Sequence, residues 1–597
     1  MVSALNDVAA SIRREDYPRA LLLLNRLHAA RSADPELLGL YGYVNFKLGR
    51  FDKADSSIRK ALRKRSQDPR LLNLLCNLQM KQGDFEGAKE TATSCLRADA
   101  TNLEAAFNLG SIWFRLEEYA PAEAQFLDVL RLDPSHADAL TYLGLICQRT
   151  ARYDEALEYY DRALEPDPDS PEALQNKGVV LNRLLRPKRA IACLQRADAR
   201  RPDNPTICHN LASAYVLDGD SERALHYFRK AIRLEPLNPE HHHWCNLFLW
   251  KENSGEFLGS YHEVLRETPD AHAIRRELVH KLRMARRYEE ADTQLQILIE
   301  KDGSEPENYR LQGEILRGRR QFSEALDAHR LAYQLAPGDD RVKEALATSY
   351  LSLGEADKAL ELIGELTSSG FEKQGYWALK AIALRLLRSE EYAYLYDYER
   401  LVLRDIIDPP EPFSSLREFN QELFRELRQH HTARAQPLDQ SLLNGTQSLG
   451  HLFHGSADIT KQLQHALDAR MSRFLESLPS DGAHPALARN RGTFSYAGAW
   501  SVILESSGHH VNHFHSDGWY SGPYYVQLPD EVTDDANTDG WIKLGEPGFE
   551  MAEPLGADCI IRPEEGMLIR FPSYMWHGTF PFDSRRQRVI VGCDIVP

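Results

Sequence analysis

Alanine recurs every 34 positions along the first two thirds of the chain, within segments whose apolar positions follow helical spacing. The series runs through Ala20, Ala54, Ala88, Ala122, Ala156, Ala190 and Ala224, and resumes after an irregular unit near residue 257 with Ala291, Ala325, Ala359 and Ala393. A small residue such as Gly110 lies twelve positions before several of these alanines, and a large one such as Phe126 lies four positions after. Small residues let two helices approach closely, and large ones fill the space beside them. The pattern therefore predicts repeated pairs of antiparallel helices.

Proline follows twelve positions after several of the alanines, where it ends the second helix of a unit. The segment AFNLGSIWFRLEEYAPAEAQFLDVLRLDP at residues 106–134 combines all of these features and resembles the tetratricopeptide repeat. The resemblance implies an α solenoid of about 11–12 helix pairs over residues 1–405, with a surface that binds a protein or peptide. The alternatives are a rigid spacer or a dimerisation arm.

The helical period stops near residues 403–416, where Asp408-Pro409-Pro410 indicates a stiff linker. Ser415 and Glu418 then have the spacing of a helix-capping box. We predict a linker and helix over residues 406–434, whose apolar stripe packs on a sheet. A second amphipathic helix is expected around residues 463–478, and its apolar stripe is expected to pack on the sheet as well.

From about residue 492 the period changes to two, in short segments rich in β-branched and aromatic residues that Gly, Pro and Asp separate. Helices followed by many short strands favour a helix-supported β-sandwich of the jelly-roll kind. The predicted fold class is therefore an α solenoid followed by an α+β domain over residues 435–597.

Composition narrows the class of protein. The chain has 597 residues and a net charge of −16, which argues against a nucleic-acid binder. No apolar run is long enough to span a membrane, and the N-terminal segment lacks the pattern of a secretory signal. Eight dispersed cysteines without a CxxC pair predict reduced thiols and a cytoplasmic protein.

The candidate chemistry lies in the second domain. His513, His515 and Asp517 alternate, so they share one face if the chain is extended, and His577 follows a strand about sixty residues later. Two ligands from one strand and a distant histidine can bind one face of a metal ion and leave the other open. This is the 2-His-1-carboxylate arrangement of non-haem Fe(II) oxygenases.

Arg588 begins the last predicted strand and shares a face with Ile590, Gly592 and Asp594, pointing into the barrel. A buried guanidinium there requires an anion, and the distal carboxylate of 2-oxoglutarate would supply one. Tyr525 is a candidate hydroxyl donor to the same group.

Four segments make a resemblance explicit: PLDQSLLNGTQS, HVNHFHSDGWYSGPYYV, GEPG and FPSYMWHGTFPF. With them, residues 435–597 look like the 2-oxoglutarate/Fe(II)-dependent dioxygenase domain of bacterial proteins that also carry tetratricopeptide repeats. The resemblance implies a double-stranded β-helix, Fe(II) and 2-oxoglutarate. By position, His577 matches the distal metal histidine, Arg588 the cosubstrate arginine, and Tyr525 the tyrosine beside that carboxylate.

The sequence allows two choices for the pair of metal ligands that lie close together in the chain, here called the proximal pair. The usual His-x-acid motif selects His515 and Asp517, with His577, as the catalytic ligands. Sequences of the group often run His-x-His-Pro instead, which selects His513 and His515 and gives three histidines. We assign no role to the further histidines His451, His454, His509 and His510. Trp519, Tyr520 and Trp576 are either core aromatics or the lining of the substrate entrance.

These observations predict a 2-oxoglutarate-dependent hydroxylase that acts on a protein or peptide side chain captured by the repeats. One alternative is a protein-interaction adaptor with an inactive β-domain. Another is a three-histidine metal enzyme that does not use 2-oxoglutarate.

Overall fold

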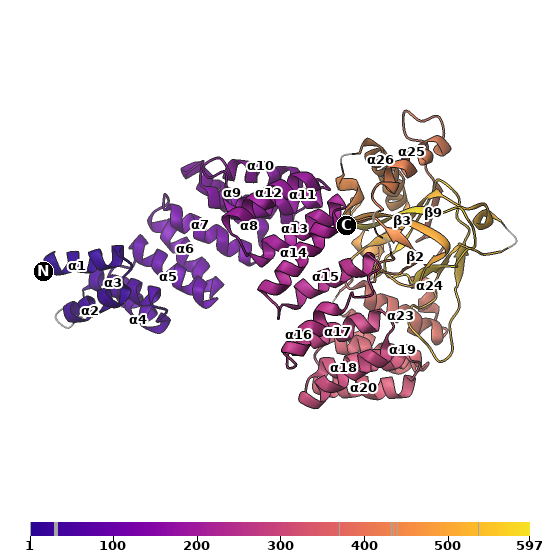
Figure 1. Cartoon of the computed structure of the whole chain (residues 1–597), viewed down its shortest axis with the longest axis horizontal. Helices are drawn as coiled ribbons and strands as arrows, with labels where there is room; N and C mark the ends of the chain where they lie inside the picture. The colour runs from indigo at the N-terminus through magenta and orange to yellow at the C-terminus, as the bar shows by residue number, and fades with distance from the viewer. Residues whose placement is uncertain are drawn as a thin grey trace. The chain divides into compact units, whose positions relative to one another are not determined.

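The computed structural model describes residues 2–28, 34–368, 370–431, 433, 435–438, 440–455, 457–534 and 537–597. Within them, helices α1–α24 form twelve successive pairs, which confirms the repeat prediction (Figure 1). The repeat helices are α1 (Val2–Arg13), α2 (Tyr17–His28), α3 (Pro35–Lys47), α4 (Phe51–Leu62), α5 (Pro69–Gln82), α6 (Phe85–Ala98), α7 (Leu103–Arg115), α8 (Tyr119–Leu132), α9 (Ala137–Arg149), α10 (Tyr153–Ala163), α11 (Pro171–Arg183), α12 (Pro187–Arg200), α13 (Pro205–Asp218), α14 (Ser221–Leu234), α15 (Pro239–Lys251), α16 (Gly259–Glu267), α17 (His272–Met284), α18 (Tyr288–Lys301), α19 (Pro306–Gly318), α20 (Phe322–Leu335), α21 (Asp340–Ser352), α22 (Ala356–Thr367), α23 (Gln374–Leu386) and α24 (Glu390–Leu395).

The small and large residues of each repeat meet as predicted. A Cβ atom added to Gly110 would lie 2.8 Å from the ring of Phe126, and one added to Gly144 would lie 2.5 Å from the ring of Tyr160. Both rings are fully buried. Glycine is therefore required for close packing inside these pairs, because any larger residue would displace an aromatic ring.

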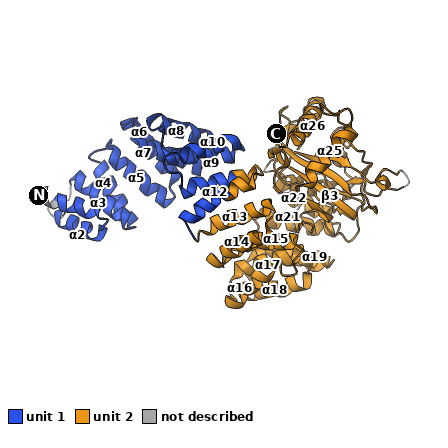
Figure 2. Ribbon diagram, turned by 45° about the horizontal axis from the view of Figure 1, so that its top comes forward, with its two compact units in different colours: residues 1–180, 192–202 blue, residues 181–191, 203–597 orange. Residues whose placement is uncertain are grey.

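The chain divides into two compact units (Figure 2). Unit 1 comprises residues 1–180 and 192–202 and contains only repeat helices. Unit 2 comprises residues 181–191 and 203–597, so it joins the later repeats and the β-sheets. The first strand begins at Leu403, and the predicted domain boundary at residues 405–406 therefore falls inside a strand.

The second part of unit 2 contains two antiparallel sheets. The six-stranded sheet has the order β1-β7-β4-β9-β3-β2, and the three-stranded sheet has the order β6-β5-β8. The strands are β1 (Leu403–Ile406), β2 (Leu442–Gln447), β3 (Ser495–His510), β4 (Tyr520–Gln527), β5 (Ile542–Leu544), β6 (Cys559–Ile561), β7 (Met567–Pro572), β8 (His577–Thr579) and β9 (Arg588–Val596).

Alternation along β9 separates two environments. Val589, Val591 and Cys593 pack with apolar residues of α25 (Leu416–Arg428) and α26 (Asp458–Ser477), such as Leu423 and Leu463. The alternate residues Arg588, Ile590, Gly592 and Asp594 line a cavity, which also reaches Cys593. The predicted packing of both amphipathic helices on a sheet is therefore confirmed. Ser415 caps α25 by accepting a hydrogen bond from Glu418 N–H, as its sequence predicted.

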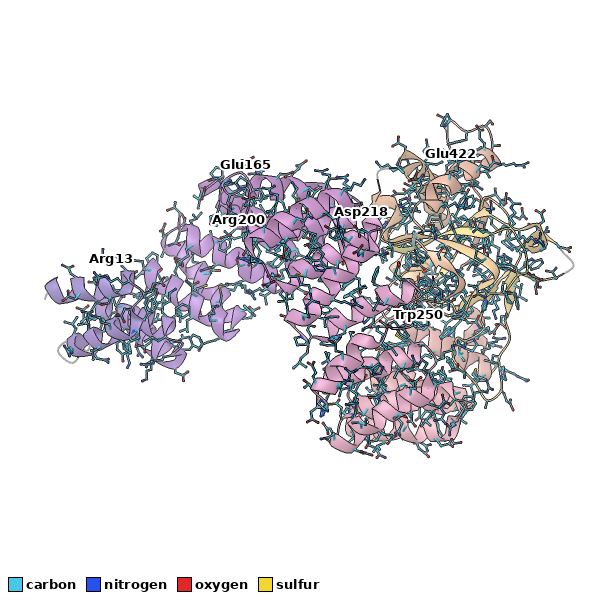
Figure 3. All side chains as sticks on the ribbon, in the orientation of Figure 1. Arg13, Glu165, Arg200, Asp218, Trp250 and Glu422 are labelled. Atoms are coloured by element: carbon cyan, nitrogen blue, oxygen red, sulfur yellow. The ribbon has the colours of Figure 1, made fainter. Side chains whose placement is uncertain are left out.

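One hydrophobic core runs through the last repeats and the sheets. Trp377 and Ile382 of α23 belong to the same buried cluster as Tyr520 of β4 and Ile590 of β9. A second contact lies on α15 at Trp250, which Figure 3 labels; its Nε1 donates a 2.7 Å hydrogen bond to the Gln436 carbonyl oxygen. Among the described helices, none combines the length and apolarity needed to cross a membrane.

Candidate metal centre

His513 and His577 are brought together by the main chain. Each backbone N–H donates to the other residue's carbonyl oxygen, at 2.8 Å and 2.9 Å, as in an antiparallel bridge. His515 N–H donates to the Ser573 carbonyl oxygen at 2.9 Å, which fixes the neighbouring segment in the same way. The three imidazole rings consequently lie with their centres 4.1–5.1 Å apart.

One nitrogen atom from each of these three rings lies within 4.8 Å of the other two, which is a possible metal site. The Nδ1 atom of His513 faces the Val511 carbonyl oxygen at 2.9 Å, and that of His577 faces the Met575 carbonyl oxygen at 2.9 Å. Carbonyl oxygens only accept, so both Nδ1 atoms carry the proton. The Nε2 lone pairs then face away from these carbonyls, and that of His513 lies 3.3 Å from Ser441 Oγ, a contact that a metal ion would replace.

Burial favours the uncharged form of His513 and His577. Burial, followed by the neighbouring His515, lowers the pKa of His513 to about 3. Burial, followed by His513, lowers the pKa of His577 well below its usual range. Metal ions bind neutral imidazole, so neither ring has to lose a proton before binding at neutral pH.

The third imidazole is oriented by a carboxylate. His515 Nδ1 lies 2.8 Å and 2.9 Å from the two carboxylate oxygens of Asp594 on β9. Burial alone would raise the pKa of Asp594, but the charge and hydrogen bond of His515 outweigh it and hold that pKa below the usual value. A carboxylate on Nδ1 fixes the tautomer and makes Nε2 a stronger ligand.

Asp517 does not belong to this three-histidine cluster, although it lines the same cavity. The main chain bends at Ser516 and Asp517, the Asp517 side chain is exposed, and its carboxylate accepts a 3.0 Å hydrogen bond from Ser516 Oγ. Among the residues that the structure describes, the three ligand atoms that converge are those of His513, His515 and His577.

Arg588 is only 1% exposed, and its guanidinium carbon lies 5.4 Å from the centre of the Tyr525 ring. Its Nε and Nη1 atoms have no hydrogen-bond partner among the described residues. Burial lowers the pKa of Arg588, and Tyr525 partly offsets that effect. A buried guanidinium with open donors is costly unless an anion binds it.

The three histidines and Arg588 line one cavity of about 600 Å³ between the two sheets. Tyr525 and Trp500 line it as well, and the Trp500 ring stacks on His515 with centres 5.9 Å apart. The cavity therefore offers a metal site and a separate cationic site. By its chemistry, this donor set fits a metal ion at the histidines and an anionic group at Arg588.

Sequence reasoning gave no role to two residues of the site. The sequence placed Asp594 on the same face of β9 as Arg588, at an even number of positions from it. That spacing was the signal that could have identified Asp594 as a residue of the site. His510 lines the cavity, and its Nδ1 lies 3.1 Å from Ser441 Oγ. Its spacing from His513 is odd, so strand alternation does not reveal it.

The structure also shows where the other aromatic and histidine residues lie. Trp519 and Tyr520 are fully buried core residues, and Trp576 is 6% exposed. His451, His454 and His509 are not among the residues that line the cavity.

Residues 498–594 match the family described as "Putative 2OG-Fe(II) oxygenase". Tetratricopeptide-repeat families match residues 10–69, 74–137, 114–171, 148–205, 205–236 and 316–382. Among curated proteins, none is significantly similar to the chain.

Several solved structures are similar to the repeats. PilF of Pseudomonas aeruginosa is 18% identical, and the match covers 35% of this chain and 96% of PilF with a TM-score of 0.33. A tetratricopeptide repeat protein of Parabacteroides merdae is 18% identical over 53% of this chain and 98% of its own, with a TM-score of 0.32. YrrB, described as a TPR protein with an unusual peptide-binding site, is 22% identical, and the match covers 31% of this chain and 96% of YrrB with a TM-score of 0.27.

Proposed function

Since the chain is a tetratricopeptide-repeat protein with a C-terminal domain of the 2OG-Fe(II) oxygenase family, we propose that it is a 2-oxoglutarate-dependent hydroxylase of a protein or peptide side chain. The observation that carries the proposal is the shared cavity, which is lined by three histidines with converging ring nitrogens and by a buried arginine with open donors. A cavity without a binding role would require neither the three converging histidines nor the buried arginine.

His513, His515 and His577 would hold Fe(II), and Arg588 with Tyr525 would hold the far carboxylate of 2-oxoglutarate. The bound pair supplies oxidation of a C–H bond by molecular oxygen, with succinate and carbon dioxide as the products from the cosubstrate. Asp594 and the two backbone carbonyls hold the imidazoles in one tautomer. His577 and Arg588 are both buried, at 7% and 1% exposed.

The repeats support a polypeptide substrate, because stacked helix pairs present an extended surface for a chain. The later repeats belong to the same compact unit as the cavity. A substrate bound along them would therefore be held next to the metal site, which raises its local concentration there.

Anaerobic addition of Fe(II), with and without 2-oxoglutarate, tests the cofactor assignment. We expect a weak visible charge-transfer band that requires both additions and is absent in the His577→Ala variant. Succinate formation in air, measured with and without candidate peptides, would then test the substrate class. Absence of bound iron in the wild-type protein would contradict the proposal and favour the adaptor with an inactive β-domain.

The three-histidine cluster favours one second candidate. A site with three histidines and no carboxylate also suits a metal enzyme that does not use 2-oxoglutarate. That candidate predicts bound iron, no band on addition of 2-oxoglutarate, and metal-dependent oxygen consumption that is insensitive to Arg588→Met.

A further inference from the structure

The segment that precedes the metal ligand His577 is held from outside the sheets. Tyr396, directly after α24, is 2% exposed. Its hydroxyl donates a 3.1 Å hydrogen bond to the Tyr574 carbonyl oxygen and accepts a 3.0 Å bond from the Trp576 N–H. Tyr574 reciprocates, because its own hydroxyl donates to the Leu395 carbonyl oxygen at 2.9 Å. The end of the last repeat and the approach to His577 are therefore locked together.

One peptide group connects Tyr396 to the metal ligand. The N–H of the Met575–Trp576 peptide donates to the Tyr396 hydroxyl, and the carbonyl oxygen of the same peptide accepts from His577 Nδ1 at 2.9 Å. A peptide group is planar and moves as one body. Fixing its N–H therefore fixes the acceptor that sets the tautomer and direction of the His577 ring.

The side chains on either side of this peptide are also anchored to the repeats. Trp576 Nε1 donates to the Ala378 carbonyl oxygen of α23 at 3.1 Å. Phe514, between the other two histidines, packs edge-to-face on Trp576 with ring centres 4.9 Å apart. A Cβ atom added to Gly375 of α23 would lie 3.0 Å from the Phe514 ring, so this helix is in close contact with both histidine segments.

A loop of the oxygenase domain holds the same helix from its other side. Arg385 of α23 donates to the carbonyl oxygens of Gly545 and Gly556 at 2.9 Å and 2.8 Å, and forms an ion pair with Asp558 at 2.6 Å. In the previous repeat, the Ser352 carbonyl oxygen accepts a 2.8 Å bond from Ala552 N–H. These bonds fix α23 relative to the sheets that carry the histidines.

We propose that Tyr396, a residue of the repeat array, is a positioning residue for the metal ligand His577 and acts through the Met575–Trp576 peptide. The inference rests on the metal site proposed above. Removing the hydroxyl leaves the buried Trp576 N–H without its acceptor, and the peptide rotates to find another. The His577 Nδ1–H then loses its fixed partner, and the metal loses an oriented ligand.

The test compares Tyr396→Phe with Tyr524→Phe in the full chain. Tyr524 is a matched control, because it is also buried and its hydroxyl donates a 2.7 Å bond to Asn420, but it packs against the helices on the other face of the sheet. Mn(II) is titrated while the electron paramagnetic resonance signal of the free ion is followed. We expect Tyr396→Phe to weaken Mn(II) binding about tenfold, and Tyr524→Phe to bind like wild type at a similar loss of melting temperature.

Two further measurements keep the inference open to contradiction. The absorption spectrum of bound Co(II) should change in Tyr396→Phe and not in Tyr524→Phe, since only the former alters ligand geometry. Trp576→Phe keeps the backbone N–H but loses the bond to Ala378 and part of the ring packing on Phe514, so it should weaken Mn(II) binding by about twofold to fivefold. This variant tests the anchoring to α23 if Tyr396→Phe does not fold.

The outcomes separate the two proposals. If wild-type protein takes up no Mn(II), or if His577→Ala takes it up equally well, the metal site itself is wrong. If wild type binds Mn(II), His577→Ala does not, and Tyr396→Phe binds with wild-type affinity and spectrum, the metal site stands and the positioning role of Tyr396 is overturned.

Discussion

His515 Nδ1 lies 2.8 Å from the carboxylate of Asp594, although the two residues are 79 positions apart in the chain. The pair directs His515 Nε2 toward the nitrogens of His513 and His577. The carboxylate orients the His515 ring through its Nδ1, as the main-chain carbonyl oxygens of Val511 and Met575 orient the rings of His513 and His577. All three imidazoles are therefore oriented before any metal binds.

Asp594→Asn should weaken metal binding about ten- to a hundredfold, because the amide lacks the charge that strengthens His515 as a ligand. Asp468→Asn is a suitable control, since Asp468 accepts a 2.7 Å hydrogen bond from Tyr496 and does not line the cavity. Isothermal titration with Mn(II) measures both variants. Equal affinities in the two variants would show that Asp594 has no special role.

The ligand set can be tested by single alanine substitutions. His513→Ala and His577→Ala should each abolish Fe(II) binding, because each removes one of three converging nitrogens. Asp517→Ala should retain affinity within about twofold, because an exposed side chain outside the cluster contributes little. Iron content after anaerobic loading and gel filtration measures this. Loss of iron in Asp517→Ala, with retention in His513→Ala, would instead select His515 and Asp517 as the proximal pair.

Arg588→Met should weaken 2-oxoglutarate binding by about 1.5–3 kcal/mol, or about ten- to a hundredfold, because a charged hydrogen bond is lost. Metal affinity should be unchanged, since the guanidinium is not a ligand. Titration of the Fe(II)-loaded protein with 2-oxoglutarate under anaerobic conditions measures the first value, and Mn(II) binding measures the second. An Arg588→Met protein that binds 2-oxoglutarate like wild type would contradict the assignment.

A buried histidine in the repeats gives a prediction about pH. His329 is 0% exposed, its Nδ1 lies 2.6 Å from Ser349 Oγ, and burial lowers its pKa to about 3. The unfolded chain binds a proton on this residue below about pH 6.5, and the folded chain does not. Stability should therefore be lost as the pH falls from about 6.5 toward 3, by about 1.4 kcal/mol per pH unit from this group.

Comparison of wild type with His329→Gln isolates that contribution. Between pH 7 and pH 5, the free energy of unfolding of wild type should fall by about 2 kcal/mol more than that of the variant. Urea unfolding at the two pH values measures the difference. Parallel pH dependence in both proteins would mean that His329 is protonated in the folded state.

The repeat architecture could be predicted because its determinants are local. The spacing of Ala122, Gly110 and Phe126 is set by two neighbouring helices that touch within one unit, so sequence periodicity records the contact directly. Alternation along β9 is local in the same sense, and it placed Arg588 on the cavity face.

The choice among His513, His515 and Asp517 could not be made from spacing. Alternation places all three on one face only if the strand continues, but β3 ends at His510 and the chain bends at Ser516 and Asp517. The bend depends on hydrogen bonds to residues about sixty positions away, among them the bridge to His577. The contact between Tyr396 and Trp576 could not be predicted from sequence periodicity for the same reason, because the two residues are 180 positions apart.

The core that α23 shares with the sheets bears on how this protein could be re-engineered. Joining a foreign repeat array at Asp408 would discard Tyr396 and the α23 main chain, and would uncover the apolar faces of Trp576 and Phe514. A chimera needs α21 to α24 from this chain, because Ser352 of α21 also binds the loop of the oxygenase domain. A transplantable module that contains the oxygenase domain must therefore begin within the repeat array that precedes it.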